Sequence, residues 1–196
     1  WKSIESRGRL GVFLRADPAL RGIHILRHPC GFVSSVLRGE RKNKFGGGKD
    51  SEDFGMFGIL CELPGARRRG LTPADFRTMS PAGRLAWRWL LVNEKAMDDC
   101  SGLGNYLAVN YDQICAAPVD HARKMYEFAE LAWNQQTESF VSASTGHELS
   151  AYYSVFKDPL KSANKWKTEL DEGEIREVLN IIQDSKPGRM FVDATS

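Results

Sequence analysis

The chain has 196 residues, of which 42% are hydrophobic and 10% aromatic, and its formal net charge is +2 at pH 7. This composition excludes an intrinsically disordered chain and is typical of a folded globular protein. The nearly balanced charge argues against a dedicated nucleic-acid-binding protein, which usually carries a clear basic excess. A small anionic ligand needs only a local cluster of positive side chains, so it is not excluded. The length favours a single domain spanning residues 1–196.

The four cysteines are Cys30, Cys61, Cys100 and Cys115, and no two of them form a Cys-x-x-Cys pair. Because no Cys/His cluster has the spacing of zinc ligands, we expect free thiols, a reducing compartment such as the cytoplasm, and no bound metal. An even number of cysteines also allows pairing across the fold. No apolar run approaches the roughly 20 residues that span a bilayer, so we expect no membrane segment in this chain.

The first regular elements are predicted on either side of a His-Pro pair. Residues 20–26 form a short apolar run with β-branched side chains, which predicts a buried strand that ends near Arg27. His28 precedes Pro29, and proline suits the first turn of a helix whereas the residue before it avoids helical angles. A helix is therefore predicted from Pro29. Its apolar face comprises Phe32, Val33, Val36 and Leu37. A strand followed at once by a helix is the building unit of an α/β sheet.

Residues 40–53 are charged, rich in glycine and without periodicity, which predicts an exposed and mobile loop. Residues 46–49 read Gly-Gly-Gly-Lys and invite comparison with a phosphate-binding loop. Such a loop follows an apolar strand, which is absent here, so we interpret this stretch as solvated. The arginines at 67–69 have the same interpretation.

Capping residues predict two helices in the middle of the chain. Thr72 is followed by proline and, three residues on, by Asp75, which resembles a capping box. Ser80 is likewise followed by proline, and the apolar spacing after it predicts a long helix to about Met97.

The second half of the chain predicts one strand and two helices. Residues 107–111 form another short apolar run, typical of a strand. Asp120 is the expected cap of a helix, and Asp171, with Glu174 three residues later, is the expected cap of another. The apolar stripe of the first helix comprises Met125, Phe128, Ala129, Leu131 and Ala132. That of the second comprises Ile175, Val178, Leu179 and Ile182. The whole pattern is of the α/β class.

Arg27 and Ser35 are the first candidates for a binding site. Arg27 comes at the carboxyl end of a predicted strand, where open α/β sheets bind ligands, and the helix that follows presents its N-terminal N–H groups to an anion. A guanidinium suits phosphate oxygens, and Ser35 adds a hydroxyl. The alternative is that Arg27 pairs with a carboxylate and Ser35 lies on an ordinary helix surface.

An arginine, then Asn or Asp, then proline, with a serine eight residues after the arginine, is the 3′-phosphate-binding signature of sulfotransferases. Arg27, His28, Pro29 and Ser35 resemble this motif, with His28 where Asn or Asp is usual. The resemblance implies a three-layer P-loop NTPase-like fold with a central parallel sheet flanked by helices. It also implies that Arg27 and Ser35 bind the 3′-phosphate of the co-substrate 3′-phosphoadenosine 5′-phosphosulfate (PAPS) and of the product 3′,5′-phosphoadenosine.

Two further segments agree with the same family in order and spacing. Residues 109–115 resemble a strand end that the family writes Tyr-Glu-Asp-Leu, and residues 128–131 a later helix end. Lys165, Trp166 and Lys167 resemble the basic and aromatic stretch that closes over the nucleotide in sulfotransferases. The resemblance therefore implies that these three residues are further nucleotide contacts. The alternatives are a core anchor for Trp166 and solvated side chains for the lysines.

The family binds the 5′-phosphosulfate with a Gly/Ser/Thr-rich loop after its first strand, and nothing before Leu20 has that form. The expectation is a single sulfotransferase-like domain that lacks its N-terminal strand, loop and helix. The implied reaction transfers a sulfuryl group from PAPS to a hydroxyl or amine of a small-molecule or glycan acceptor. The alternatives are a kinase-like nucleotide-binding relative and a non-catalytic interaction protein of the same fold.

No catalytic base is assigned from the sequence. Glu94 and His147 are the remaining candidates, but neither lies in a motif, and His24 is expected to be a strand residue inside the sheet. The acceptor and the oligomeric state stay open.

Overall fold

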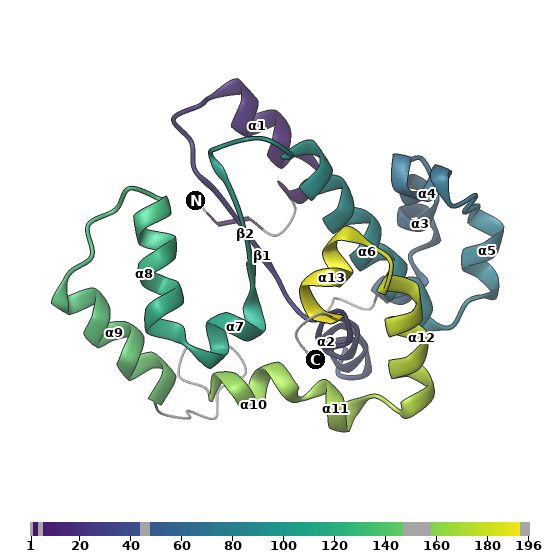
Figure 1. Ribbon diagram of the computed structural model, residues 1–196. Coiled ribbons are helices and arrows are strands. Elements are labelled where there is room, and N and C mark those ends of the chain that lie inside the picture. The colour runs from purple at the N-terminus through teal and green to yellow at the C-terminus, as the bar shows by residue number, and fades with distance from the viewer. Residues whose placement is uncertain (1, 4–5, 44–47, 147–157, 193–196) are drawn as a thin grey trace.

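The computed structural model describes residues 2–3, 6–43, 48–146 and 158–192, which form a mostly helical chain with two short strands (Figure 1). The elements, in chain order, are the 3-10 helix η1 (Ser6–Arg9), α1 (Leu10–Ala16), β1 (Gly22–Leu26), α2 (Pro29–Arg41), the 3-10 helix η2 (Asp50–Glu52), α3 (Phe54–Cys61), α4 (Pro64–Arg68), α5 (Pro73–Thr78), α6 (Pro81–Asp99), β2 (Tyr106–Asn110), α7 (Tyr111–Ala116), α8 (Pro118–Phe128), α9 (Gln135–Gly146), α10 (Pro159–Asn164), α11 (Trp166–Glu169), α12 (Glu172–Ile182) and α13 (Lys186–Val192).

The two strands pair in parallel, in a register that joins Leu26 to Asn110. Parallel strands need a long crossover, which here runs through α2 to α6. His24 is 4% exposed; its Nδ1 lies 2.9 Å from the Tyr106 hydroxyl, and its Nε2 lies 3.0 Å from Asn93 Oδ1 of α6. The expected place of His24 inside the sheet is confirmed. Burial lowers its pKa to about 4, so the ring is neutral near pH 7.

The α/β class is confirmed, with a much smaller sheet than a three-layer fold contains. The described strands number two, and Ile25, which alternates with His24 across β1, is 51% exposed. In the described part of the chain, helices therefore cover one face of a two-stranded sheet. Three layers are not seen among these residues.

Helix α6 lies at the centre of the helical core. Ser80 caps it by accepting the N–H of Gly83 at 2.9 Å, as its sequence position predicts. Helices α2, α12 and α13 pack against it, so its apolar residues lie at the centre of the core (Figure 1). Trp89 is 2% exposed, and its indole N–H donates to the carbonyl oxygen of Arg27 at 3.0 Å. This bond ties the end of β1 to the core.

The other predicted helix starts are mostly confirmed. Thr72 with Asp75, and Asp171 with Glu174, form complete capping boxes at α5 and α12. The start at Asp120 is wrong, because α8 begins at Pro118. The stripe predicted beyond Phe128 is also wrong: α8 ends there, Glu130 has a φ of 57°, and Leu131 is 59% exposed. A backbone with positive φ cannot continue the helix.

The loop predicted at residues 40–53 is more ordered than expected where the structure describes it. Helix α2 continues to Arg41, and Ser51 is only 2% exposed. Its N–H and hydroxyl donate to the Glu40 carboxylate at 2.7 and 2.8 Å, and its carbonyl accepts from Arg84 Nε at 2.6 Å. Sequence reasoning missed this anchor because charged and small residues carry no periodic signal. Residues 44–47 lie outside the described residues.

Two further properties of the described residues concern a membrane-spanning helix and the cysteines. Their helices do not combine the length and the apolar character that crossing a bilayer requires. The four cysteines are buried and unpaired.

Candidate functional site

Arg27 lies one residue beyond the end of β1, beside the N-terminus of α2. Its guanidinium is partly buried, donates from Nη2 to the carbonyl oxygen of Ser162 at 3.3 Å, and lies 5.9 Å from the centroid of the Tyr111 ring. Its Nε is buried and has no hydrogen-bond partner among the described residues. A buried donor of this kind costs free energy until an acceptor reaches it. The residue is therefore an incompletely satisfied cation at the carboxyl edge of the sheet.

His28 is the N-cap of α2. Its Nδ1 accepts the N–H of Cys30 at 3.2 Å, which satisfies one free amide of the first turn of α2. Burial lowers the pKa of His28 to about 4, and the positive charges of Lys167 and Arg27 act in the same direction. The ring is thus neutral near pH 7. A histidine at this position can therefore cap the helix.

The segment from α10 to α11 lies beside α7 and α2 (Figure 1). The half-buried Trp166 begins α11 and stacks on the His28 ring, with centroids 4.4 Å apart and planes 8° apart. Lys167 Nζ lies 5.6 Å from the Trp166 ring centroid, and Lys165 is exposed immediately before α11. The structure therefore brings Trp166, with Lys167 beside it, to His28, the residue after Arg27, over a sequence separation of more than 130 residues. Trp166 also packs against the core cluster that includes Cys30 and Val33.

Ser35 is half-buried on α2, four residues after Gly31, so both lie on one face of the helix. A Cβ placed on Gly31 would lie 3.1 Å from Arg27 Nε and 3.5 Å from Trp166 Cδ1, so this face meets the site. On the same helix, Ser34 and Arg38 both donate to the Glu169 carboxylate of α11. These bonds hold α11 against α2. Ser35 makes neither of these bonds.

Sequence reasoning missed Asp112, which stands at the end of the neighbouring strand. Asn110 caps α7 and accepts the N–H of Asp112 at 2.8 Å. Asp112 Oδ1 is buried without a hydrogen-bond partner among the described residues. Burial raises the pKa of this carboxyl group, while Arg27 and Lys167 act to lower it. The signal that marks Asp112 in the sequence is its position at the carboxyl end of a strand.

Of the two candidate bases, Glu94 does not belong to this site. Glu94 is 6% exposed and accepts a bidentate pair of hydrogen bonds from Arg69 at 2.7 and 2.9 Å. Hydrogen bonds from Arg69 lower the pKa of Glu94, so it is a structural carboxylate. The expectation that Arg69 is merely solvated is wrong, because α4 brings it to α6. His147 lies outside the described residues.

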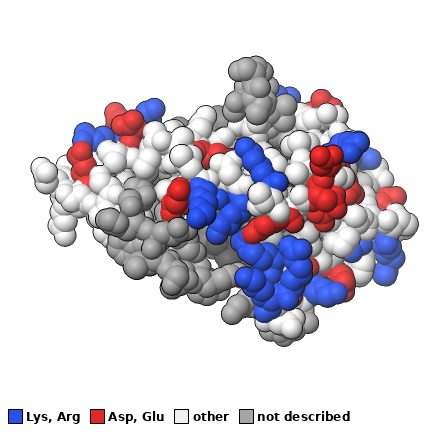
Figure 2. Space-filling view, turned by 90° about the horizontal axis from the view of Figure 1, so that it is seen from below, with Lys and Arg blue, Asp and Glu red and all other residues white. Residues whose placement is uncertain are grey.

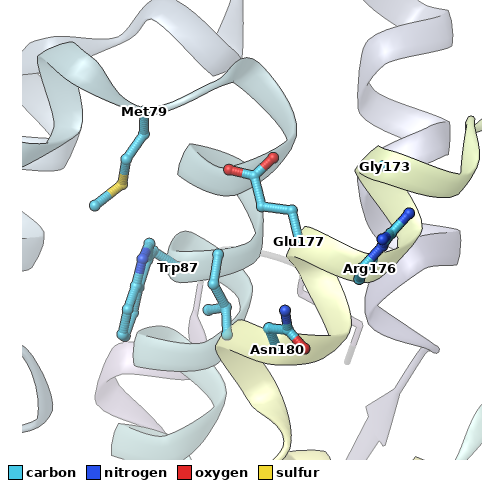
Figure 3. Close-up of a pocket in the computed structure, with 7 residues that line it drawn as sticks. Met79, Trp87, Gly173, Arg176, Glu177 and Asn180 are labelled. Atoms are coloured by element: carbon cyan, nitrogen blue, oxygen red, sulfur yellow. The ribbon is translucent and has the colours of Figure 1, made fainter.

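A separate pocket of about 570 Å³ opens between α6 and α12 (Figure 3). Its lining residues are Met79, Trp87, Gly173, Arg176, Glu177, Asn180 and Ile181. Glu177 accepts the hydroxyl of Ser80, the cap of α6, at 2.6 Å. None of the predicted site residues lines this pocket, so it is distinct from the site at Arg27.

Positive charge gathers on the side where α10 and α11 lie. Figure 2 shows Lys and Arg side chains in the middle of this face, with Asp and Glu side chains among them. Arg38 is matched by Glu169, as noted above, whereas Lys165 and Lys167 form no ion pair within 4.0 Å among the described residues. Arg27 is likewise without a carboxylate partner in the described part of the chain. The unmatched charge favours an anionic ligand.

Comparison with known proteins gives a consistent but distant likeness. No family model matches the chain, and no solved structure matches it. The chain is 24% identical over 179 residues to mouse carbohydrate sulfotransferase 2 and, over the same length, to the human protein of that name. These alignments cover 84% of this chain and 34% of each relative, so the chain spans about a third of their length. Human carbohydrate sulfotransferase 3 is 32% identical over 66 residues, which cover 33% of this chain and 14% of that protein. The matches support distant homology between this chain and the carbohydrate sulfotransferases.

Proposed function

We propose that this chain forms the 3′-phosphate-binding part of a PAPS-dependent sulfotransferase. The observation that carries the proposal is the buried Nε of Arg27, which lacks a partner among the described residues and lies where β1 ends and α2 begins. In this proposal Arg27 and Ser35 hold the 3′-phosphate, and Lys165, Trp166 and Lys167 form the segment that closes over the nucleotide. The distant homology to sulfotransferases supports the assignment.

The arrangement fits a phosphate for three physical reasons. A guanidinium forms strong, charge-assisted hydrogen bonds with phosphate oxygens. The N-terminus of the 13-residue helix α2 adds its positive dipole end and free N–H groups. Lys167 adds a second positive charge, with its Nζ 5.6 Å from the centroid of the Trp166 ring. His28 contributes no charge, because its ring is neutral, but it fixes Trp166 in place by stacking.

The proposed reaction moves a sulfuryl group from the 5′-phosphate of PAPS to an acceptor hydroxyl or amine. The bond between sulfur and the bridging phosphate oxygen breaks, a new bond forms from sulfur to the acceptor atom, and the acceptor proton passes to a base. The residues of this chain would bind and orient the nucleotide, so that binding energy distant from the sulfur supports the transfer. A glycan acceptor is part of the proposal because the relatives are carbohydrate sulfotransferases.

The remaining parts of the proposal concern the surroundings of the site. Strands β1 and β2 would be two strands of a larger parallel sheet in a three-layer P-loop NTPase-like fold. Residues 1–196 would form one domain with free thiols in the cytoplasm.

Titration of this chain with 3′,5′-phosphoadenosine and with ADP, which lacks the 3′-phosphate, tests the proposal. We expect saturable binding of the first nucleotide and at least tenfold weaker binding of the second, because charge-assisted bonds to the 3′-phosphate are lost. Arg27→Ala should abolish this preference, while Arg67→Ala, at an exposed arginine of α4, should keep it. Equal binding of both nucleotides would favour the kinase-like alternative, and no binding of either would favour a non-catalytic interaction protein.

A further inference from the structure

Two buried polar atoms of opposite kinds lack partners at the same edge of the sheet. Arg27 Nε is a donor and Asp112 Oδ1 is an acceptor, and both are buried without a hydrogen bond to any described residue. No other buried side-chain nitrogen or oxygen within the described ranges is left unsatisfied in this way. Each such atom costs free energy in the ligand-free protein. We therefore ask which single ligand could satisfy both atoms.

The strand register places the two residues beside each other. Leu26 and Asn110 are partners in the parallel ladder, and Arg27 and Asp112 follow them by one and two residues. Asn110 Oδ1 holds the backbone of Asp112 through its N–H at 2.8 Å, which fixes the position of the carboxylate without using it. The Arg27 guanidinium lies over the ring of Tyr111, the residue immediately before Asp112.

The two groups attract each other but do not bond. Each shifts the other's pKa toward its charged form, yet no ion pair within 4.0 Å joins them in the described structure. A carboxylate beside a phosphate site is unfavourable unless a donor also reaches it, because two anions repel each other. The pair therefore suits a ligand that presents an anionic acceptor and a neutral donor side by side.

A ribose 3′-phosphate has this chemistry. Its 2′-hydroxyl is on the carbon next to the one that carries the phosphate, so a donor and an acceptor are adjacent. Carboxylates that accept a ribose 2′-hydroxyl recur at the carboxyl edge of parallel sheets. We propose that Asp112 accepts a hydrogen bond from the 2′-hydroxyl of the nucleotide whose 3′-phosphate is held by Arg27, and so selects ribonucleotides. This inference rests on the proposed function and extends it to a specificity-determining residue.

The test compares 3′,5′-phosphoadenosine with its 2′-deoxy form on the unmodified chain and on Asp112→Ala. The unmodified chain should bind the 2′-deoxy form roughly 10- to 100-fold more weakly, as expected for the loss of a hydrogen bond to a charged group. Asp112→Ala should bind both with similar affinity. Its affinity for the 2′-deoxy form should stay the same or rise, since a carboxylate near the phosphate has been removed. Asp112→Asn, which keeps an acceptor oxygen, should retain part of the preference.

The control is Asp120→Ala, at an exposed acidic residue on the neighbouring helix α8, which should keep the full preference. Asp112→Ala should remain folded, because the capping bond from Asn110 uses the backbone of residue 112. If the unmodified chain does not distinguish the two nucleotides, or if Asp112→Ala weakens both equally, the inference is wrong while the proposed function stands. If neither nucleotide binds, the proposed function fails and the inference fails with it.

Discussion

Gly31→Ala should separate the ligand-binding role of Arg27 from the stability of the fold. Gly31 is the third residue of α2, where alanine favours the helix over glycine by about 0.5–1 kcal/mol. The new Cβ would lie 3.1 Å from Arg27 Nε, so the guanidinium must move by a few tenths of an ångström, and a flexible side chain can do so at small cost. The contact with Trp166 Cδ1, at 3.5 Å, is an ordinary van der Waals distance. We expect the free energy of unfolding to stay the same or to rise by up to about 1 kcal/mol.

The same substitution should weaken nucleotide binding, because the methyl group crowds the Nε that we assign to the 3′-phosphate. Loss of one charge-assisted hydrogen bond predicts about tenfold or greater weakening. Isothermal titration with 3′,5′-phosphoadenosine measures the affinity, and urea unfolding measures the stability. Gly58→Ala is the matched control, since Gly58 lies within α3 and a Cβ there would meet nothing within 4 Å. Equal affinity in both variants would refute the assignment of Arg27 Nε.

Further predictions concern the structure around the site. Arg69→Ala should lower the free energy of unfolding at pH 7 by about 2 kcal/mol, less than for a fully buried pair, because Arg69 is 28% exposed. The depressed pKa of Glu94 contributes stability that is present above its unfolded pKa and lost on acidification, so the Arg69→Ala deficit should shrink in urea unfolding at pH 3. His24 and His28 have pKa values lowered to about 4, so the unfolded chain binds more protons between pH 6.5 and 4. Stability should therefore fall with decreasing pH across that window, by up to about 1.4 kcal/mol per pH unit for each histidine, while their NMR signals do not titrate above pH 5. His28→Asn should keep the helix cap and lose only the stacking on Trp166, at a cost of about 1 kcal/mol, whereas His28→Ala should cost about twice as much; equal losses in thermal unfolding would contradict this.

The local signals in the sequence were enough to predict most of the elements. Prolines at the first helical position marked the starts of α2, α5 and α6, and the capping box at Asp171 marked α12, because these interactions span three or four residues. The anchoring of Ser51 by Glu40 was not predictable, since it joins polar residues across a stretch without periodicity. The size of the sheet could not be predicted either, because strand pairing depends on residues far apart in the chain.

The candidate site was predictable only where local signals in the sequence mark its residues. Arg27 was found from its place between a strand and a proline-started helix. That Trp166 and Lys167 lie close to it was expected only from the family resemblance, and the structure places Trp166 on His28, the N-cap of α2, with Lys167 beside Trp166. Asp112 follows a predicted strand, which is a weak local signal, but its burial without a partner depends on the pairing of β1 with β2, which local patterns do not encode.

The most direct test of the central claim is a crystal structure of this chain grown with 3′,5′-phosphoadenosine. The account predicts a 3′-phosphate oxygen about 2.7–3.1 Å from Arg27 Nε, as in charge-assisted hydrogen bonds, with Ser35 on the same phosphate. A nucleotide bound in the pocket between α6 and α12, or an Arg27 side chain that turns to Asp112 and leaves the phosphate untouched, would contradict it.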